Sequence, residues 1–287
     1  MNLRLRKCLL FLISTGMYVL SGCKMAEQKE AAPAAAVMTD KWILKNLEER
    51  SSRAVPLKAN GQCEMLFYVK SKPHKENFPV QLWVNPPSEI YMQGDVAFNA
   101  KGVVLGSNTE EFWFALQPKE ISSCWWGLWS QQSSLGTMMI NPHVVLEGMG
   151  IMKIDSEEQW TFGQEDSYRV LTRQDEGRTK RIYVNRHDGR IRRMEYVGTE
   201  GEAVTVAELD KYTKLAEDFY VPTQVKIIRR LTSDKAGFVS ITLKISSVKA
   251  TGFTEEQKQF LFQRRPMQGF KHIYRIIDSK VVEQQQE

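Results

Sequence analysis

Alternation of apolar and polar residues with a period of two is the feature that most limits how this chain can fold. Residues 239–246 show it most clearly, because Val, Ile, Leu and Ile alternate there with Ser, Thr, Lys and Ser. A period of two places all the apolar side chains on one face of a β-strand. The same alternation recurs over residues 62–70 and 221–231. The chain is therefore expected to be mainly β.

Acidic residues close to glycine separate the alternating segments in the second half of the chain. They occur at residues 175–177, 188–189, 200–201 and 234–237. Because such pairs are strong hairpin signals, residues 159–248 are expected to form an antiparallel meander of about six strands. The first half adds strands and raises the total to about ten or eleven; these are expected near residues 62–70, 79–84, 88–96, 103–106 and 111–117.

Three short segments carry helix signals. Asp40 is a candidate N-cap for a helix over residues 40–51, and Asn141-Pro142 opens a second helix of one or two turns. Thr254 is a candidate cap for a third, over residues 253–262. A long sheet curls, and its apolar face must be covered. We therefore expect a mainly β (α+β) fold, a highly curved antiparallel sheet with two or three short helices covering its concave face.

The N-terminus carries a short export signal. Arg4, Arg6 and Lys7 precede an apolar run over residues 8–20, followed by Ser, Gly and Cys23. A run of about 13 residues is too short to span a bilayer, which needs roughly 20, but it suits a signal peptide. The segment resembles the bacterial lipoprotein lipobox, which implies that Cys23 is diacylated and begins the mature chain. The alternative is a plain secretory signal with a chance cysteine.

The sequence is expected to have four parts, of which the first two follow from the lipobox resemblance. They are a lipoprotein signal peptide (1–22), a lipidated flexible tether (23–37), a folded domain (38–275) and a polar C-terminal tail (276–287). Two or more acyl chains anchor a protein stably, at about 0.8 kcal/mol per buried methylene group. Lys24 follows the cysteine, where Asp would favour the inner membrane. By analogy, we expect a lipoprotein of the outer membrane that faces the periplasm.

Two cysteines remain in the expected folded domain, Cys63 and Cys124. In an oxidising periplasm they could form a disulfide. Equally, each could be a small buried hydrophobic residue. Neither has a ligand partner at close spacing, so no metal site is expected.

The order of features along the chain resembles the LolA/LolB-like lipoprotein-carrier superfamily. These features are the lipobox, the helix near residue 40, the run of antiparallel strands and the closing segment over residues 260–266. Periplasmic stress sensors of the RseB kind are among its relatives. Residues 106–114 (GSNTEEFWF) resemble a stretch of LolA-like lipoproteins of unassigned role. The resemblance spans about residues 40–270. It implies an unclosed barrel with helices as a lid and an apolar hollow that binds acyl chains.

Enzyme motifs are absent from the sequence: it contains no HExxH, GxSxG, SxxK, P-loop or complete GxGxxG pattern. The histidines His74, His143, His187 and His272 lie far apart, beside no repeated acidic or cysteine partner. We expect them at the surface or in turns. The chain is thus not expected to be an enzyme or to bind a metal or other cofactor.

The charge of the chain argues against nucleic-acid binding. The net charge is +5, and three of the positive charges lie in the expected signal peptide. Phosphate-backbone binding needs a concentrated basic face. The polar faces of the expected strands do carry lysines and arginines, which we expect at a solvated outer face or, alternatively, near anionic lipid headgroups; they are Lys180, Arg181, Arg190, Arg192, Arg193, Lys226, Arg229 and Arg230.

Aromatic residues and methionines concentrate between residues 112 and 152. One interpretation is a solid core for a large sheet. The other is a hydrophobic cavity or lid, because methionine adapts to guests of variable shape. The candidate residues for this cavity or lid are Phe112, Phe114, Trp125, Trp126, Trp129, Met138, Met139 and Met149.

Two functional hypotheses follow. The first is a monomeric, lipid-anchored cell-envelope protein that is held to membrane lipid through Cys23. It would bind acyl chains or lipoproteins in an apolar half-barrel cavity and take part in sorting them to the outer membrane. The alternative is a non-catalytic structural or protein-interaction lipoprotein with the same fold and no working cavity.

Overall fold

The computed structural model describes residues 39–284 apart from ten gaps: 70–71, 97–98, 118–120, 132–140, 152–153, 155–157, 176–177, 199–202, 231–237 and 278–279. Residues Val37–Glu287 form one compact unit. The predicted signal peptide, Cys23 and the tether lie outside the described residues, as do Met138 and Met139. No helix in the described part of the chain is long and apolar enough to cross a membrane.

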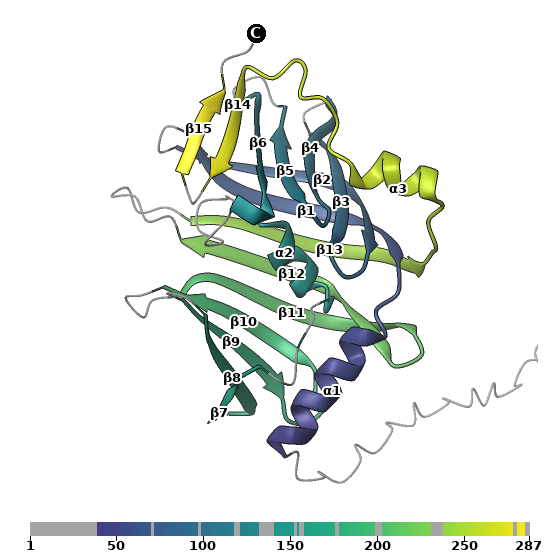
Figure 1. Ribbon diagram of the computed structural model, residues 1–287, viewed down its shortest axis with the longest axis vertical. Coiled ribbons are helices and arrows are strands. Elements are labelled where there is room, and N and C mark those ends of the chain that lie inside the picture. Colours follow the sequence, from purple (N-terminus) through teal and green to yellow (C-terminus); the bar gives the residue numbers. More distant parts are fainter. Residues whose placement is uncertain are drawn as a thin grey trace, which may run out of the picture. The chain divides into compact units, whose positions relative to one another are not determined.

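The described residues form one 15-stranded sheet and a few short helices (Figure 1). The helices are α1 (Asp40–Ser52), the 3-10 helix η1 (Trp129–Gln131), α2 (Pro142–Gly148) and α3 (Glu255–Phe262). The strands are β1 (Leu57–Val69), β2 (Lys72–Asn85), β3 (Glu89–Val96), β4 (Asn99–Ser107), β5 (Glu111–Leu116), β6 (Ser123–Leu128), β7 (Thr161–Glu165), β8 (Tyr168–Asp175), β9 (Arg178–Asn185), β10 (Ile191–Val197), β11 (Ala203–Ala216), β12 (Phe219–Arg230), β13 (Phe238–Ala250), β14 (His272–Ile277) and β15 (Lys280–Gln284).

The strand order is β15-β14-β6-β5-β4-β3-β2-β1-β13-β12-β11-β10-β9-β8-β7. Neighbouring strands are antiparallel except β14 and β6, which run parallel. The mainly β, curved and unclosed sheet expected from the sequence is thus confirmed, with more strands than expected. The extra strands include β6, and also β14 and β15, which extend the folded region to Gln284.

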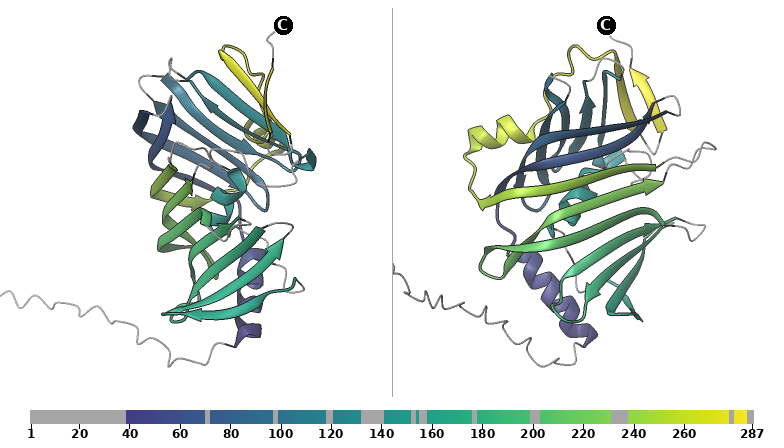
Figure 2. Two further views of the ribbon diagram at one scale, coloured as in Figure 1. Left: turned by 90° about the vertical axis from the view of Figure 1, so that its left-hand side faces the viewer. Right: turned by 180° about the vertical axis from the view of Figure 1, so that it is seen from behind.

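The sheet curls around helix α2. This helix contacts β4, β11 and β12, although five strands separate β4 from β11 in the sheet order. A flat sheet would hold these two strands far apart, because neighbouring strands lie about 4.8 Å from each other. We call the face that carries α2 the concave face and the opposite face the outer face. Figure 2 shows the curvature from two further directions.

The main core lies on the concave face. It joins apolar side chains of β1–β5 and β8–β13 to those of α1 and α2. Helix α1 contributes Ile43 and Leu47. Its N-cap is Thr39, one residue before the expected Asp40; Asp40 instead forms an ion pair with Arg169 at 2.6 Å, which ties the start of the helix to β8.

Helix α3 lies on the outer face, where Leu261 and Phe262 pack with Tyr91 and Trp113. Thr254 caps it with a complete capping box, as predicted. Two of the three helices therefore cover the concave face, which agrees with the two or three expected, and the third lies on the outer face. Trp113 and Tyr91 point outward because they alternate along their strands with residues of the main core.

Candidate functional site

The predicted cavity residues divide between the two faces of the sheet. Phe112, Phe114 and Met149 lie in the main core on the concave face and are almost fully buried. Trp125 and Trp129 are half-buried against the same core. The structure therefore brings five of the predicted residues together on one face.

Trp126 lies on the outer face and cannot line a concave cavity. It pairs with Trp113 across β5 and β6 and packs in the same cluster as α3. Its ring lies under two guanidinium groups, with Arg264 at 4.1 Å and Arg275 at 5.1 Å from the ring centroid. The prediction that Trp126 belongs to the cavity or lid is wrong, because neighbouring residues of a strand point to opposite faces.

Aromatic stacking joins helix α2 to the sheet. The Trp129 ring lies between the rings of Phe112, at 4.5 Å, and His143, at 3.8 Å. Its Nε1 donates a hydrogen bond to the backbone oxygen of Asn108 at 3.0 Å. His143 is therefore half-buried in the first turn of α2, not at the surface as expected, and burial lowers its pKa. The neighbouring Lys180 lowers that pKa further, against an opposing effect of Glu147.

Helix α2 fits closely against the concave face. Asn141 caps its first turn and Pro142 occupies the start, as the sequence predicts. Val144, Val145 and Leu146 are buried. A Cβ atom at Gly148 would lie only 3.0 Å from Cγ1 of Val225, so glycine allows this helix to approach β12 closely.

A buried ion pair also ties α2 to the sheet. Lys180 of β9 donates to Oε1 of Glu147 at 2.8 Å, and the two side chains are only 9% and 18% exposed. Oε2 of Glu147 is buried and has no hydrogen-bond partner among the described residues. Glu147 is thus incompletely satisfied, which leaves α2 less firmly held than its packing alone would suggest.

Cationic and hydroxyl side chains form a row across the concave face. Cross-strand pairing places Lys180 beside Tyr196, Tyr196 beside Thr205, and Thr205 beside Arg229. Arg178 precedes Lys180 by two residues and so shares its face. We call these five residues the cationic row. The sequence assigned Lys180 and Arg229 to the outer face; they point inward because they share a face with the core residues Ile182 and Ile227.

Two features of the cationic row favour an anionic guest. Burial, together with the smaller effect of the Arg178 charge, lowers the pKa of Arg229 to about 10. The hydroxyl of Tyr196 is buried and lacks a hydrogen-bond partner in the described part of the chain. An anion beside these groups would accept hydrogen bonds and offset the repulsion of the two guanidinium groups.

A small hollow lies where α1 meets the concave face. It measures about 50 Å³, and Leu47, Arg50, Arg190, Tyr212 and Phe219 are among its lining residues. Binding sites for small molecules usually measure about 300–1,000 Å³. This hollow is therefore too small for an acyl chain.

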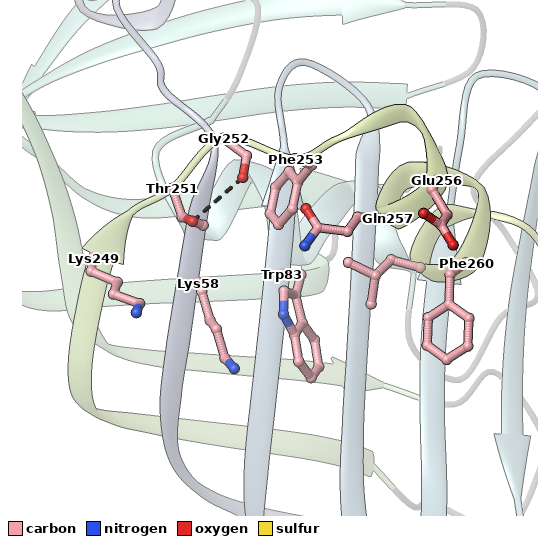
Figure 3. Close-up of a pocket in the computed structure, with 10 residues that line it drawn as sticks. Lys58, Trp83, Lys249, Thr251, Gly252, Phe253, Glu256, Gln257 and Phe260 are labelled. Atoms are coloured by element: carbon pink, nitrogen blue, oxygen red, sulfur yellow. Dashed lines mark hydrogen bonds between the residues drawn. The ribbon is translucent and has the colours of Figure 1, made fainter.

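The outer face carries a larger groove between α3 and strands β1, β2 and β13, which we call the outer groove. It measures about 550 Å³ and is half-apolar (Figure 3). Lys58 and Lys249 lie at one end of it, Trp83 forms the floor, and Phe253 and Phe260 lie toward α3. Nothing in the sequence pattern pointed to this groove, because its two walls are about 170 residues apart in the chain.

A second groove of about 530 Å³ flanks α3. Its lining is rich in glutamates, of which Glu111 pairs with Arg264 and Glu255 with Lys258, both at 2.8 Å. Among the described residues, no group of three or more His, Cys, Asp or Glu side chains could hold a metal ion.

The cysteines are free and buried. Cys63 belongs to the main core on the concave face, whereas Cys124 alternates with Trp125 and so points outward. Four strands also separate β1 from β6. The alternative of a disulfide is therefore wrong. Burial raises the pKa of both thiols to about 12, so both remain protonated and unreactive.

Several solved structures resemble this chain over about three quarters of its length. Solved structures with similar folds include a LolA superfamily protein from Nitrosomonas europaea (TM-score 0.47, 13% identity, covering 77% of this chain and 96% of that one). A domain named for outer membrane lipoprotein sorting, from Vibrio parahaemolyticus, has a TM-score of 0.46 and 13% identity over 76% of this chain and 97% of its own.

A DUF1329 family protein from Desulfovibrio piger has a TM-score of 0.46 and 10% identity, with 77% of this chain and 95% of that one covered. No family model matches the sequence, and no curated protein matches it.

Proposed function

We propose that this chain is a lipid-binding protein of the cell envelope that receives an acyl chain, free or attached to a lipoprotein, between α2 and the concave face. In this proposal Cys23 is lipidated and anchors the protein to the outer membrane, facing the periplasm, where it takes part in sorting its guests. The folded unit acts as a monomer.

One observation carries the proposal: the concave face combines an apolar floor under a short helix with the cationic row. An acyl chain would lie against the apolar floor once α2 has moved outward to admit it. Its anionic headgroup would lie near Arg178 and Arg229 and accept a hydrogen bond from Tyr196. Apolar contacts for the chain and a few polar groups for the head are the usual composition of a lipid site.

The free energy gained by burying an acyl chain is comparable to the free energy lost when α2 is displaced. An acyl chain of about 15 methylene groups gains on the order of 12 kcal/mol when it leaves water. Displacing α2 exposes the side chains of Val144, Val145, Leu146 and Met149, at roughly 1.5–3 kcal/mol each, or about 6–12 kcal/mol in total. A carrier needs this near-balance, because it must release its guest again.

The close packing of the concave face favours the alternative function, a structural or interaction lipoprotein without a working cavity. Phe112, Phe114 and Met149 are at most 2% exposed, as expected of a solid core. The two functions differ in one respect that can be measured, which is whether a lipid displaces α2.

Lipid binding can be tested on the full chain with Cys23→Ser, which cannot be acylated. Native mass spectrometry should detect co-purified lipid, and titration with stearate should reveal a site whose affinity falls at least about tenfold in Arg178→Ala/Arg229→Ala. The matched control is Arg186→Ala/Arg230→Ala, which removes two exposed arginines. No bound lipid, or equal affinity in both double variants, would favour the structural alternative.

The anchor is tested separately. Chain recovered from membranes should carry a mass increase from acyl groups on Cys23, and Cys23→Ser should release the chain from the membrane fraction. An unmodified Cys23 would leave only the secretory interpretation.

A further inference from the structure

The outer face carries a row of eight paired residues across eight strands, and all of them except Gly106 have large or charged side chains. Cross-strand pairing joins the members in sequence. From β13 to β14 they are Lys249, Lys58, Trp83, Tyr91, Gly106, Trp113, Trp126 and Arg275. Helix α3 covers the middle of this row through Leu261 and Phe262, and the Lys249–Lys58–Trp83 end stays open as the outer groove.

The open end of the row has an aromatic floor. The Trp83 and Tyr91 rings lie 5.7 Å apart, and Nζ of Lys58 lies 5.1 Å from the Trp83 ring centroid. Phe260, on the neighbouring turn of α3, is 61% exposed. An exposed phenylalanine in the same groove as a half-buried tryptophan is an unusual surface for a protein that contacts only water.

Two like charges face each other at the end of this floor. Lys58 and Lys249 are directly paired across β1 and β13, and like charges directly opposite in a sheet are destabilising. A single acidic residue, Glu256, is among the groove-lining residues. It projects from α3, across the groove from the lysines (Figure 3). An anion between the two ammonium groups would turn this repulsion into attraction.

We propose that the outer groove binds a single-chain anionic amphiphile, with its carboxylate or phosphate between Lys58 and Lys249 and its acyl chain along Trp83 toward Phe253 and Phe260. The groove volume, about 550 Å³, is typical of sites for ligands of this size. This site lies on the face opposite to the one proposed above and does not depend on it.

The test uses the full-length protein with Cys23→Ser. It is titrated with stearate that carries bromine in the middle of its acyl chain, because bromine quenches tryptophan fluorescence on contact. Trp83→Phe should remove part of the quenching. The matched control Trp160→Phe should retain that part. Lys58→Ala/Lys249→Ala should weaken this Trp83-dependent binding at least about tenfold. Unchanged affinity in that variant, or unchanged quenching without Trp83, would overturn the proposal.

Two further variants separate binding from folding. Lys226→Ala/Lys244→Ala removes two outer-face lysines away from the groove and should leave affinity unchanged. Glu256→Gln removes the single negative charge of the groove and should raise affinity two- to fivefold, a gain that damage to the fold cannot produce. A loss of affinity in either variant would contradict the assigned headgroup position.

Three ligands with the same acyl chain distinguish a carboxylate headgroup from a phosphate headgroup. Stearate and a lysophospholipid with a terminal phosphate represent the two anionic heads, and octadecanol is the neutral control. Binding of either anion with weak binding of octadecanol supports the site; equal binding of octadecanol overturns it. Because Arg178→Ala/Arg229→Ala affects only the concave site, loss of one kind of binding does not imply loss of the other.

Discussion

The rings of Trp129 and His143 stack at a centroid distance of 3.8 Å. This contact joins η1, which directly follows β6, to the first turn of α2, and so helps to hold the helix over the concave face. His143 therefore reports on whether α2 is in place.

We predict that low pH weakens the packing of α2 against the concave face and so lowers the free energy of unfolding. Because burial lowers the pKa of His143, the folded state favours the neutral ring, and its contribution to stability is complete above the unfolded pKa of about 6.5. It declines as the pH falls from there toward the folded pKa. The free energy of unfolding, measured between pH 8 and pH 5, should fall less in His143→Phe than in the wild type.

The control for this prediction is His187→Gln, in an exposed turn, which should keep the wild-type pH dependence. If His143→Phe and the wild type lose stability in parallel, the ring does not hold α2.

The ion pair between Lys180 and Glu147 gives a second prediction. Lys180→Met leaves the carboxylate of Glu147 buried without its partner, so the free energy of unfolding should fall by about 3–5 kcal/mol. Lys180→Met/Glu147→Leu removes both charges and should recover most of that loss. Urea denaturation measures both, and additive losses in the double variant would show that the two residues do not interact.

Gly106 provides a third prediction. A Cβ atom there would lie 2.3 Å from the Trp113 ring, and α3 covers that ring, so it has little room to move. Gly106→Ala should lower the free energy of unfolding by about 1–3 kcal/mol. In the matched control Gly163→Ala, the added Cβ meets nothing within 4 Å, and stability should stay equal or rise by about 0.5 kcal/mol. Equal thermal midpoints for the two variants would contradict this packing.

The cysteines give a fourth prediction. The folded chain with Cys23→Ser should not react with a thiol reagent at Cys63 or Cys124 at pH 8, because burial keeps both thiols protonated. After denaturation in the absence of reductant both should react at once. A chain that reacts only after reduction would contain the disulfide that the structure excludes.

Much of the fold could be predicted from the sequence where one face of a strand is apolar and the other polar. Strand β13, with its strict alternation, and the capped helices at Pro142 and Thr254 are examples. Strand β6 was missed because both of its faces pack: Trp125 points to the main core and Trp126 to the α3 cluster. Without a polar side there is no alternation to detect.

The cationic row and the outer groove could not be predicted from the sequence as well as the fold could. The inward direction of the Lys180 and Arg229 side chains could have been predicted, because each residue lies two positions from an apolar residue of its own strand that belongs to the main core. Their assembly with Tyr196 and Thr205 depends on register, which the sequence does not specify. The outer groove depends on α3 lying on the outer face, and no local signal distinguishes the two faces for a capped helix.

The most direct test of the central claim, that a guest lies between α2 and the concave face, is to fasten α2 with a disulfide. The Cys23→Ser chain with Lys58→Ala/Lys249→Ala, in which the outer groove should no longer bind an anion, is the background for this test. Gly148→Cys and Val225→Cys place two thiols at a close contact of α2 with β12. We predict that oxidation lowers stearate affinity at least tenfold and that reduction restores it, because only a free α2 can yield to the chain. Equal affinity in the oxidised and reduced forms would contradict the account.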